Sequence, residues 1–202
     1  EHNYFKKISL VSLRTAGEQK LKEDDRIIIE EESTNRSELL FFSDMFNVYK
    51  TKLSDINDCK ASSLGDYLPN MLDMDENEKI IFVTHTTDYS GFLFLLFENG
   101  KAVKIPVEAY KTKTNRKRLI NAYSSKSRLI FMTFISDDRD FVLTRDNDKA
   151  CLFNTSLVSV SATKTSGGTQ LYTLKKNSAI TNICTVEEFK SSNIEFYRTN
   201  KI

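Results

Sequence analysis

The chain has 202 residues, of which 40% are hydrophobic and 28% charged, and its formal net charge is +1. This composition is that of a globular protein with a buried core, in one domain or two small ones. No stretch approaches the roughly 18 to 20 apolar residues of a membrane span, and the polar start "EHNYFKK" lacks the apolar run of a secretory signal. We therefore expect a cytosolic protein with no membrane partner, and the start at Glu1 without Met suggests a fragment of a longer chain.

The charge is distributed unevenly along the chain. Residues 1–100 carry 11 Lys and Arg against 19 Asp and Glu, a balance of −8, whereas residues 101–202 carry 18 against 9, a balance of +9. A protein that needed only solubility would mix the two signs, so this segregation indicates an anionic partner for the second half. An ordinary solvated surface is the alternative at this point.

Short apolar runs of four to seven residues recur from residue 38 onward. They are rich in Phe, Ile, Leu and Val and end at Asp, Asn, Gly or Ser, which is typical of buried strands in an all-β fold. In chain order they are "ELLFFSD" (38–44), "KIIFVTH" (79–85), "GFLFLLFENG" (91–100), "RLIFMTFIS" (128–136) and "DFVLTRDND" (140–148). One short helix is expected within "SSLGDYLPNML" (62–72), where Pro69 limits its length.

Two sequence features repeat with a period of about 50 residues. The first is an apolar residue, five mostly polar residues, and an apolar residue that opens a strand: Leu21 and Ile27, Met74 and Ile80, Tyr123 and Leu129, Leu174 and Ile180. The strand-opening residues are 53, 49 and 51 positions apart. The second is a hairpin turn 19 or 20 residues later, around Phe46, Gly100 and Asp148. A unit of this length holds about four strands, the size of a propeller blade, and the opening "EHNYFKKI" matches the same hairpin entered at its turn.

The strands that follow these turns alternate apolar and basic residues, as in "YFKKISLVSL", "NVYKTKLSDI" and "KAVKIPVEAY". Together with "TKTNRKRLINAYS" and "SGGTQLYTLKKN", this pattern resembles the C-terminal DNA-binding domain of the A subunit of bacterial type IIA topoisomerases, the gyrase and topoisomerase IV group. The resemblance extends from about Tyr4 to about Ile183. It implies one domain over residues 1–202, an all-β, propeller-like β-pinwheel of about four blades that exchange strands.

The resemblance also implies a function. A domain of this family binds and bends duplex DNA independently of its sequence, carries no catalytic residue and needs no cofactor. Its parent would be an ATP-dependent DNA topoisomerase, an isomerase located in the cytoplasm with the nucleoid. The expected partners are duplex DNA, the ATPase B subunit of the enzyme, and the remainder of the A subunit.

The segment "KTKTNRKR" (111–118) holds five cations in eight residues and lies between one hairpin and the next strand-opening anchor. The same slot holds "RTAGEQK" (14–20), "CKASSLGDY" (59–67) and "TKTSGGTQ" (163–170), and in the family these connections face DNA. Cations interspersed with hydroxyl and amide donors suit phosphate oxygens and carry little base information. The predicted DNA contacts are Lys111, Lys113, Arg116, Lys117, Arg118, Lys104, Lys164, Arg14 and Lys20. A solvated loop, or salt bridges to the acidic half, is the alternative.

The first slot departs from the gyrase pattern. Gyrases of this family carry a box of the form Q-R-R-G-G-K-G in the first blade, used for wrapping DNA and introducing supercoils. The corresponding "RTAGEQK" keeps Gly17 and Lys20 but lacks the paired arginines, which favours a protein of the topoisomerase IV type. The pair Gly167 and Gly168 is a second candidate for such a turn, although a plain tight turn explains it as well.

A catalytic function finds little support in the residues. His2 and His85 are the only histidines, and the acidic runs lack the spacing of a calcium loop. Cys59, Cys151 and Cys184 lie far apart and are expected to be reduced and structural. The alternative from another functional class is a propeller that serves as a protein-interaction scaffold through its basic rim.

Overall fold

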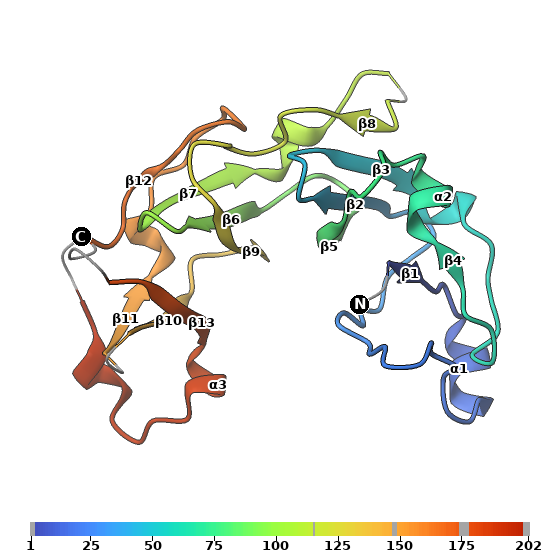
Figure 1. Cartoon of the computed structure of the whole chain (residues 1–202), viewed down its shortest axis with the longest axis horizontal. Helices are drawn as coiled ribbons and strands as arrows, with labels where there is room; N and C mark the ends of the chain where they lie inside the picture. Colours follow the sequence, from blue (N-terminus) through green and yellow to red (C-terminus); the bar gives the residue numbers. More distant parts are fainter. Residues whose placement is uncertain (1–2, 115, 147–148, 174–177, 200–202) are drawn as a thin grey trace. The chain divides into compact units, whose positions relative to one another are not determined.

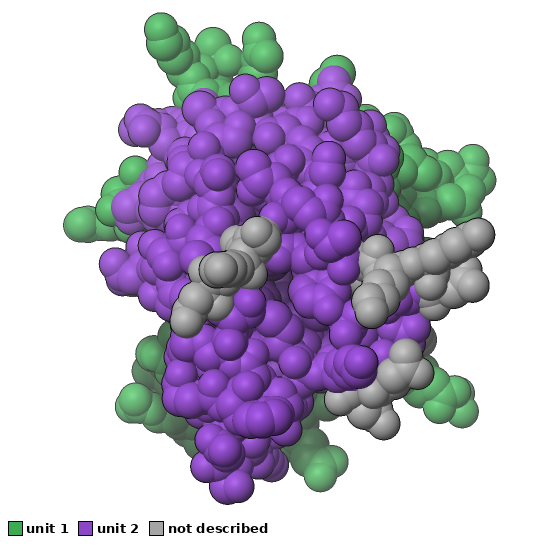
Figure 2. Space-filling view, turned by 90° about the vertical axis from the view of Figure 1, so that its left-hand side faces the viewer, with its two compact units in different colours: residues 1–88, 112–120 green, residues 89–111, 121–202 purple. Residues whose placement is uncertain are grey.

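The computed structural model describes residues 3–114, 116–146, 149–173 and 178–199. The chain forms two compact units, which Figure 2 shows in different colours. Unit 1 comprises residues 1–88 and 112–120, and unit 2 comprises residues 89–111 and 121–202. The single β-pinwheel domain expected over residues 1–202 stays a prediction. Within the described residues, no helix is long and apolar enough to cross a bilayer.

Unit 1 is built around the hairpin of β2 and β3 (Figure 1). Its strands are β1 (Tyr4–Phe5), β2 (Glu38–Ser43), β3 (Val48–Lys52), β4 (Asp66–Tyr67), β5 (Ile80–Thr86) and β8 (Arg118–Leu119). Its helical segments are α1 (Leu10–Thr15), the 3₁₀ helix η1 (Leu53–Asp55) and α2 (Leu68–Leu72). The expected helix is thus confined to α2, which has Pro69 in its first turn and ends at Asp73 in the left-handed conformation.

Unit 2 repeats this plan twice (Figure 1). Its strands are β6 (Phe92–Phe97), β7 (Lys101–Pro106), β9 (Leu129–Ile135), β10 (Asp140–Arg145), β11 (Ala150–Asn154), β12 (Thr169–Gln170) and β13 (Ile180–Thr185). Its helical segments are η2 (Val107–Tyr110), η3 (Thr155–Leu157), α3 (Val186–Phe189) and η4 (Ile194–Tyr197). All five apolar runs named from the sequence are strands, β2, β5, β6, β9 and β10, so the all-β prediction is confirmed.

The sheets follow one order, in which each hairpin receives a strand from each side. The four-stranded sheets are β5-β2-β3-β8 and β9-β6-β7-β12, and a three-stranded sheet is β13-β10-β11. In each, the outer strand that follows a hairpin pairs antiparallel with the hairpin's first strand. The hairpin's second strand pairs with a two-residue strand that lies beyond the next hairpin in sequence, β8 or β12. Neighbouring repeats therefore exchange strands, as expected, whereas the number of blades stays a prediction.

One predicted strand start is wrong. Ile27 was expected to open a strand as Ile80, Leu129 and Ile180 do, but residues 26–34 form no strand and Ile27, Ile28 and Ile29 are exposed. A strand needs a neighbour to satisfy its backbone N–H and C=O groups, and these residues have none among those described. Leu174 and the turn at Asp148 lie outside the described residues.

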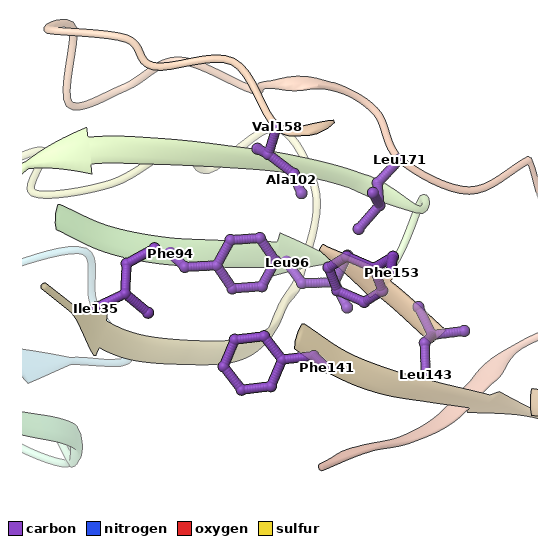
Figure 3. Packing of buried hydrophobic residues seen from close by; sticks show 9 residues of the cluster. All are labelled: Phe94, Leu96, Ala102, Ile135, Phe141, Leu143, Phe153, Val158 and Leu171. Atoms are coloured by element: carbon purple, nitrogen blue, oxygen red, sulfur yellow. The ribbon is translucent and has the colours of Figure 1, made fainter. Parts of the chain in front are cut away.

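The core of unit 2 is a cluster of aromatic and aliphatic side chains from the two hairpins (Figure 3). Phe94 is fully buried; its ring stacks on Phe141, with centroids 5.7 Å apart, and lies 6.0 Å from Phe153. Leu93 and Leu95, on the opposite face of β6, are also fully buried. Burial on both faces explains why this strand is a continuous apolar run rather than an alternating one.

Unit 1 has a smaller core on one face of its hairpin. Leu39, Phe41 and Tyr49 form it with Leu53 of η1 and Leu68 of α2, and Phe5 of β1 packs against the same cluster. The rings of Phe5 and Phe41 meet edge to face, with centroids 5.6 Å apart. This packing holds the connections at the ends of β3 and β4, which include the predicted DNA-binding loops.

Candidate nucleic-acid interface

The loop of residues 112–118 lies along the outer edge of β3 in unit 1. The buried side chain of Lys50 donates from Nζ to Thr112 Oγ1 over 3.2 Å, and its backbone N–H donates to the carbonyl of Lys117 over 2.7 Å. Thr112 Oγ1 in turn donates to the carbonyl of Thr114 over 2.8 Å. Both ends of the loop are therefore fixed by one residue of β3, which limits the conformational freedom that binding would otherwise have to remove.

Arg118, the last cation of the segment, is engaged within the protein. Its guanidinium forms a bidentate pair with Asp75, in which Nη1 donates to Oδ1 over 3.1 Å and Nη2 donates to Oδ2. The guanidinium also lies over the ring of Tyr49, 5.5 Å from its centroid. The hydrogen bond from Arg118 holds the pKa of Asp75 below its usual value, so both groups are charged at neutral pH. Arg118 thus anchors β8, and its charge is largely neutralised before any ligand binds.

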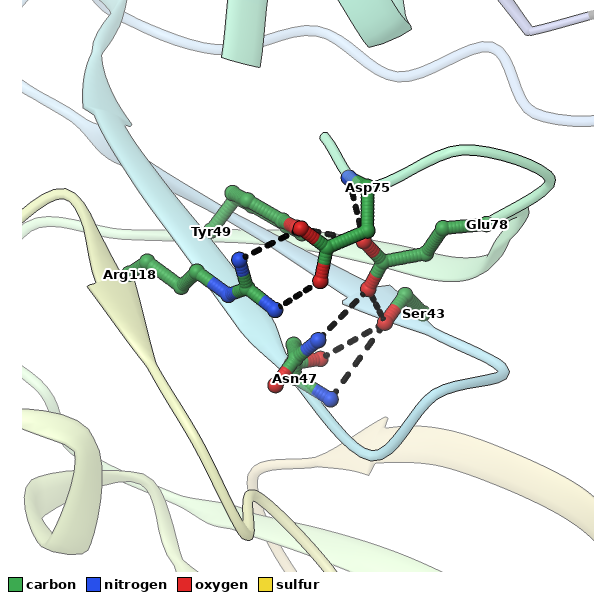
Figure 4. A network of polar contacts seen from close by, with 6 residues as sticks. All are labelled: Ser43, Asn47, Tyr49, Asp75, Glu78 and Arg118. Atoms are coloured by element: carbon green, nitrogen blue, oxygen red, sulfur yellow. Dashed lines mark hydrogen bonds and ion pairs between the residues drawn. The ribbon is translucent and has the colours of Figure 1, made fainter. Parts of the chain in front are cut away.

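A buried carboxylate supports this anchor from below (Figure 4). Glu78 is 3% exposed and accepts hydrogen bonds from Ser43 Oγ, Asn47 Nδ2, the Tyr49 hydroxyl and the backbone N–H of Asp75. Burial opposes its ionisation, but the bonds from Ser43, Tyr49 and Asn47 outweigh burial and lower its pKa. Burial, and then the neighbouring carboxylate, raise the pKa of Tyr49.

The remaining cations of the segment point into solvent. Lys113, Arg116 and Lys117 are exposed and have no ion pair with another described residue. Lys111, at the end of η2 in unit 2, is exposed too, and its ammonium lies 5.9 Å from the ring centroid of Tyr89. Asn115 lies outside the described residues. This is a set of solvated charges on a loop that the fold holds in place.

The two cations predicted from unit 2 are placed differently. Lys104 is only 6% exposed, its Nζ lies 2.7 Å from Asp138 Oδ1, and the ammonium lies 5.9 Å from the ring centroid of Phe92. That hydrogen bond, with one from Thr155, holds the pKa of Asp138 down. Lys164 is half-buried over the ring of Tyr110, and burial lowers its pKa. We therefore do not include Lys104 among the proposed phosphate contacts.

Arg14 and Lys20 lie on another connection of unit 1. Arg14 is exposed in the last turn of α1, a helix capped by Ser9, whose Oγ accepts from the N–H of Ser12. Lys20 is exposed, and its N–H donates to the carbonyl of Ala61 over 2.9 Å. The segment after α1 is therefore joined to the following connection through backbone contacts, which leave the Lys20 ammonium in solvent.

Sequence reasoning missed the structural role of a lysine that recurs in the hairpins. Lys50 and Lys104 each stand two residues beyond the pair that closes their hairpin, Phe42 with Val48 and Leu96 with Ala102. Lys6, two residues beyond the start of β1, donates from Nζ to the carbonyls of Lys20 and Ala61. Aligning the hairpins by their turns would have superposed these lysines and indicated that they hold the neighbouring connections.

The glycine pair of the last slot also has a structural explanation. Gly168 has φ +73°, a conformation that favours glycine, and a Cβ there would lie 2.1 Å from the carbonyl oxygen of Ala102. The glycine allows β12 to approach β7 closely. This favours the plain turn over a DNA-wrapping box at Gly167 and Gly168.

The repeated hairpins with exchanged strands define a propeller-like β-pinwheel. No family model matches the chain. A curated relative, the A component of DNA topoisomerase 4 from Staphylococcus epidermidis (strain ATCC 12228 / FDA PCI 1200), is 23% identical over 172 residues, which cover 83% of this chain and 22% of the relative. The chain thus spans about a fifth of the length of the curated relatives it matches.

Solved structures give the same answer for the fold. The crystal structure of the C-terminal domain of DNA topoisomerase IV matches with a TM-score of 0.75 and 22% identity, over 90% of this chain and 58% of that one. A DNA gyrase A C-terminal domain matches with a TM-score of 0.57 and 14% identity, over 93% of this chain and 63% of that one. The resemblance to the C-terminal domain of type IIA topoisomerase A subunits, predicted from the sequence, is confirmed.

Proposed function

We propose that this chain binds duplex DNA through phosphate contacts, independently of base sequence, and bends it as the C-terminal domain of a type IIA topoisomerase A subunit. The observation that carries the proposal is the loop of residues 112–118. Its ends are fixed by Lys50 and Arg118, and its exposed cations Lys113, Arg116 and Lys117 face solvent. Preorganised, solvated cations contact phosphates at a lower entropic cost than cations on a free loop.

Salt dependence of DNA affinity tests the proposal. Each phosphate neutralised by a cation contributes about −0.9 to the slope of log K against log salt. Replacing Lys113, Arg116 and Lys117 together with Ala should make the slope shallower by about two to three units and weaken binding equally for unrelated duplexes. The measurement is a fluorescence-anisotropy titration of two unrelated duplexes at several salt concentrations.

A matched triple variant controls for net charge. Lys52, Lys79 and Arg128 are exposed cations outside the loop, and replacing them with Ala removes the same three charges. This control should keep a slope close to that of the wild type. If the loop variant is folded and binds with unchanged affinity and slope, the loop contacts no DNA, and the proposal for these residues is wrong.

We extend the proposal to the parent protein, whose activity we take to be ATP-dependent DNA topoisomerisation. Its partners would be an ATPase B subunit, bound to the remainder of the A subunit. We place it in the cytoplasm, on the nucleoid, and expect DNA binding by this domain to need no cofactor. The arginine pair of the gyrase box is missing from residues 14–20, and Arg14 instead lies on α1. The assembled enzyme should therefore decatenate or relax DNA better than it supercoils it, and robust ATP-driven supercoiling of a relaxed plasmid would contradict this.

A further inference from the structure

The sheet at the start of unit 1 lacks a strand that every other sheet has. The other sheets place the first strand of a hairpin between the outer strand and the hairpin's second strand, in the order β5-β2-β3-β8, β9-β6-β7-β12 and β13-β10-β11. The first sheet contains only β1 and β4, which occupy the places of β3 and β8. Between β1 and residues 27–32, which have the place of the outer strand in sequence, the described residues supply no strand.

A cleft marks this place. Its volume is about 1020 Å³, and its apolar lining includes Phe5, Ile27, Ile28, Ile29, Leu39 and Leu68. A six-residue strand is about 20 Å long, lies about 4.8 Å from its neighbours and fills a layer about 10 Å thick, so it occupies roughly 950 Å³. The cleft therefore has the capacity of one strand of the length of β2 or β6.

The isoleucines beside the cleft are exposed without a partner strand. Ile27, Ile28 and Ile29 are 46%, 59% and 41% exposed, and their backbone groups bond to no other described residue. Three consecutive apolar side chains in that state form an adhesive edge that proteins normally cover. One contact already places the segment beside β5, because Glu31 Oε2 lies 3.6 Å from His85 Nε2.

The chain enters β1 as it enters the other hairpin strands. Asn3, directly before β1, has φ +61°, and the turns that lead into β3 and β7 contain Phe46 at φ +61° and Gly100 at φ +77°. In both of those turns the preceding residues are an apolar strand paired antiparallel with the strand that follows. The curated relatives, of which the matched region is about a fifth, leave ample polypeptide to supply such a strand.

We propose that the polypeptide directly preceding Glu1 in the parent protein forms an apolar β-strand of about six residues that fills this cleft, antiparallel to β1 on one side and to residues 27–32 on the other. It completes the first sheet in the order of the others and covers the three isoleucines. The strand joins this domain to the part of the protein that precedes it. This assignment does not depend on DNA binding.

Hydrogen exchange tests the assignment. The amides of residues 27–32 should exchange at least about 100-fold more slowly in the parent protein than in the 202-residue chain, because they acquire strand partners. Amides of β6, which is paired in both, serve as the internal reference. Equal exchange of residues 27–32 in the two proteins would overturn the proposal.

A grafted strand makes the test independent of how the longer protein behaves. A copy of residues 38–46, "ELLFFSDMF", replaces Glu1 and His2, so that the junction to Asn3 repeats the natural junction to Asn47. This graft should protect residues 27–32, whereas the same graft with its copied Leu39 and Phe41 replaced by Asn should not. If light scattering instead shows the 202-residue chain to be a dimer that Ile28→Lys dissociates, a second copy fills the cleft and the proposal is wrong.

Discussion

Replacing Glu78 with Gln removes one buried negative charge from the network in Figure 4 and leaves the size of the side chain nearly unchanged. The carboxylate accepts four hydrogen bonds, from Ser43, Asn47, Tyr49 and the N–H of Asp75. A glutamine offers one oxygen, which can accept about two of them, and its NH₂ group faces donors. Hydrogen bonds to a charged group contribute about 1.5 to 3 kcal/mol each, so losing two costs about 3 kcal/mol or more.

The loss should depend on pH in a defined direction. The pKa of Glu78 is lowered in the folded chain, so its ionisation stabilises the fold above the unfolded pKa of about 4.3, and this contribution disappears as the pH falls through the folded value. The wild type and Glu78→Gln should therefore differ by about 3 kcal/mol at pH 7, roughly 6 to 12 °C in Tm, and approach each other in acid.

Urea denaturation followed by circular dichroism at several pH values measures both effects, and Glu76→Gln is the matched control. Glu76 is exposed in the same loop, two residues away, and its replacement should change stability by less than about 0.5 kcal/mol. The reasoning is refuted if Glu78→Gln is no more destabilising than the control at pH 7, or if the difference between the two variants grows as the pH falls.

Two further perturbations test the packing of unit 2. Phe94→Ala should destabilise the fold by about 3 to 5 kcal/mol in urea denaturation, since the side chain is fully buried among Phe141 and Phe153, whereas Phe196→Ala, at a side chain 78% exposed, should cost far less; equal costs would contradict the core assignment. Gly100→Ala should cost about 1 to 3 kcal/mol for its left-handed backbone, with a clash 2.1 Å from the carbonyl oxygen of Tyr172 in addition. Gly17→Ala, which meets nothing within 4 Å, should be nearly neutral, and a thermal melt that does not separate the two glycine variants would count against this turn geometry.

The strands could be predicted from sequence because their signal is local. Runs such as "FLFLLF" are buried on both faces, and turn residues end them, so composition and spacing alone locate them. The same local signal failed at Ile27, where the apolar run is present. A strand also requires a neighbour for its backbone, and that requirement concerns a segment distant in sequence, which no local pattern reports.

The candidate site was predicted in outline but not in its division of roles. Counting cations located the loop of residues 111–118, whereas the partners that decide what each cation does lie far along the chain. Asp75, which holds Arg118, is 43 residues away, and Asp138, which holds Lys104, is 34 residues away. Pairings of this kind depend on which strands meet, so they became visible only with the sheet order.

The two sets of cations have opposite consequences for DNA binding. Lys6, Lys50 and Lys104 direct their ammonium groups at the connection that crosses their strand, and a charge used in that way releases no counterion when a phosphate approaches. The basic strands that first suggested a DNA-binding domain therefore act by positioning the loops, and the exposed loop cations provide the phosphate contacts. The salt slope of DNA binding should accordingly follow the number of exposed loop cations and stay well below a value estimated from the 18 Lys and Arg residues in the second half of the chain.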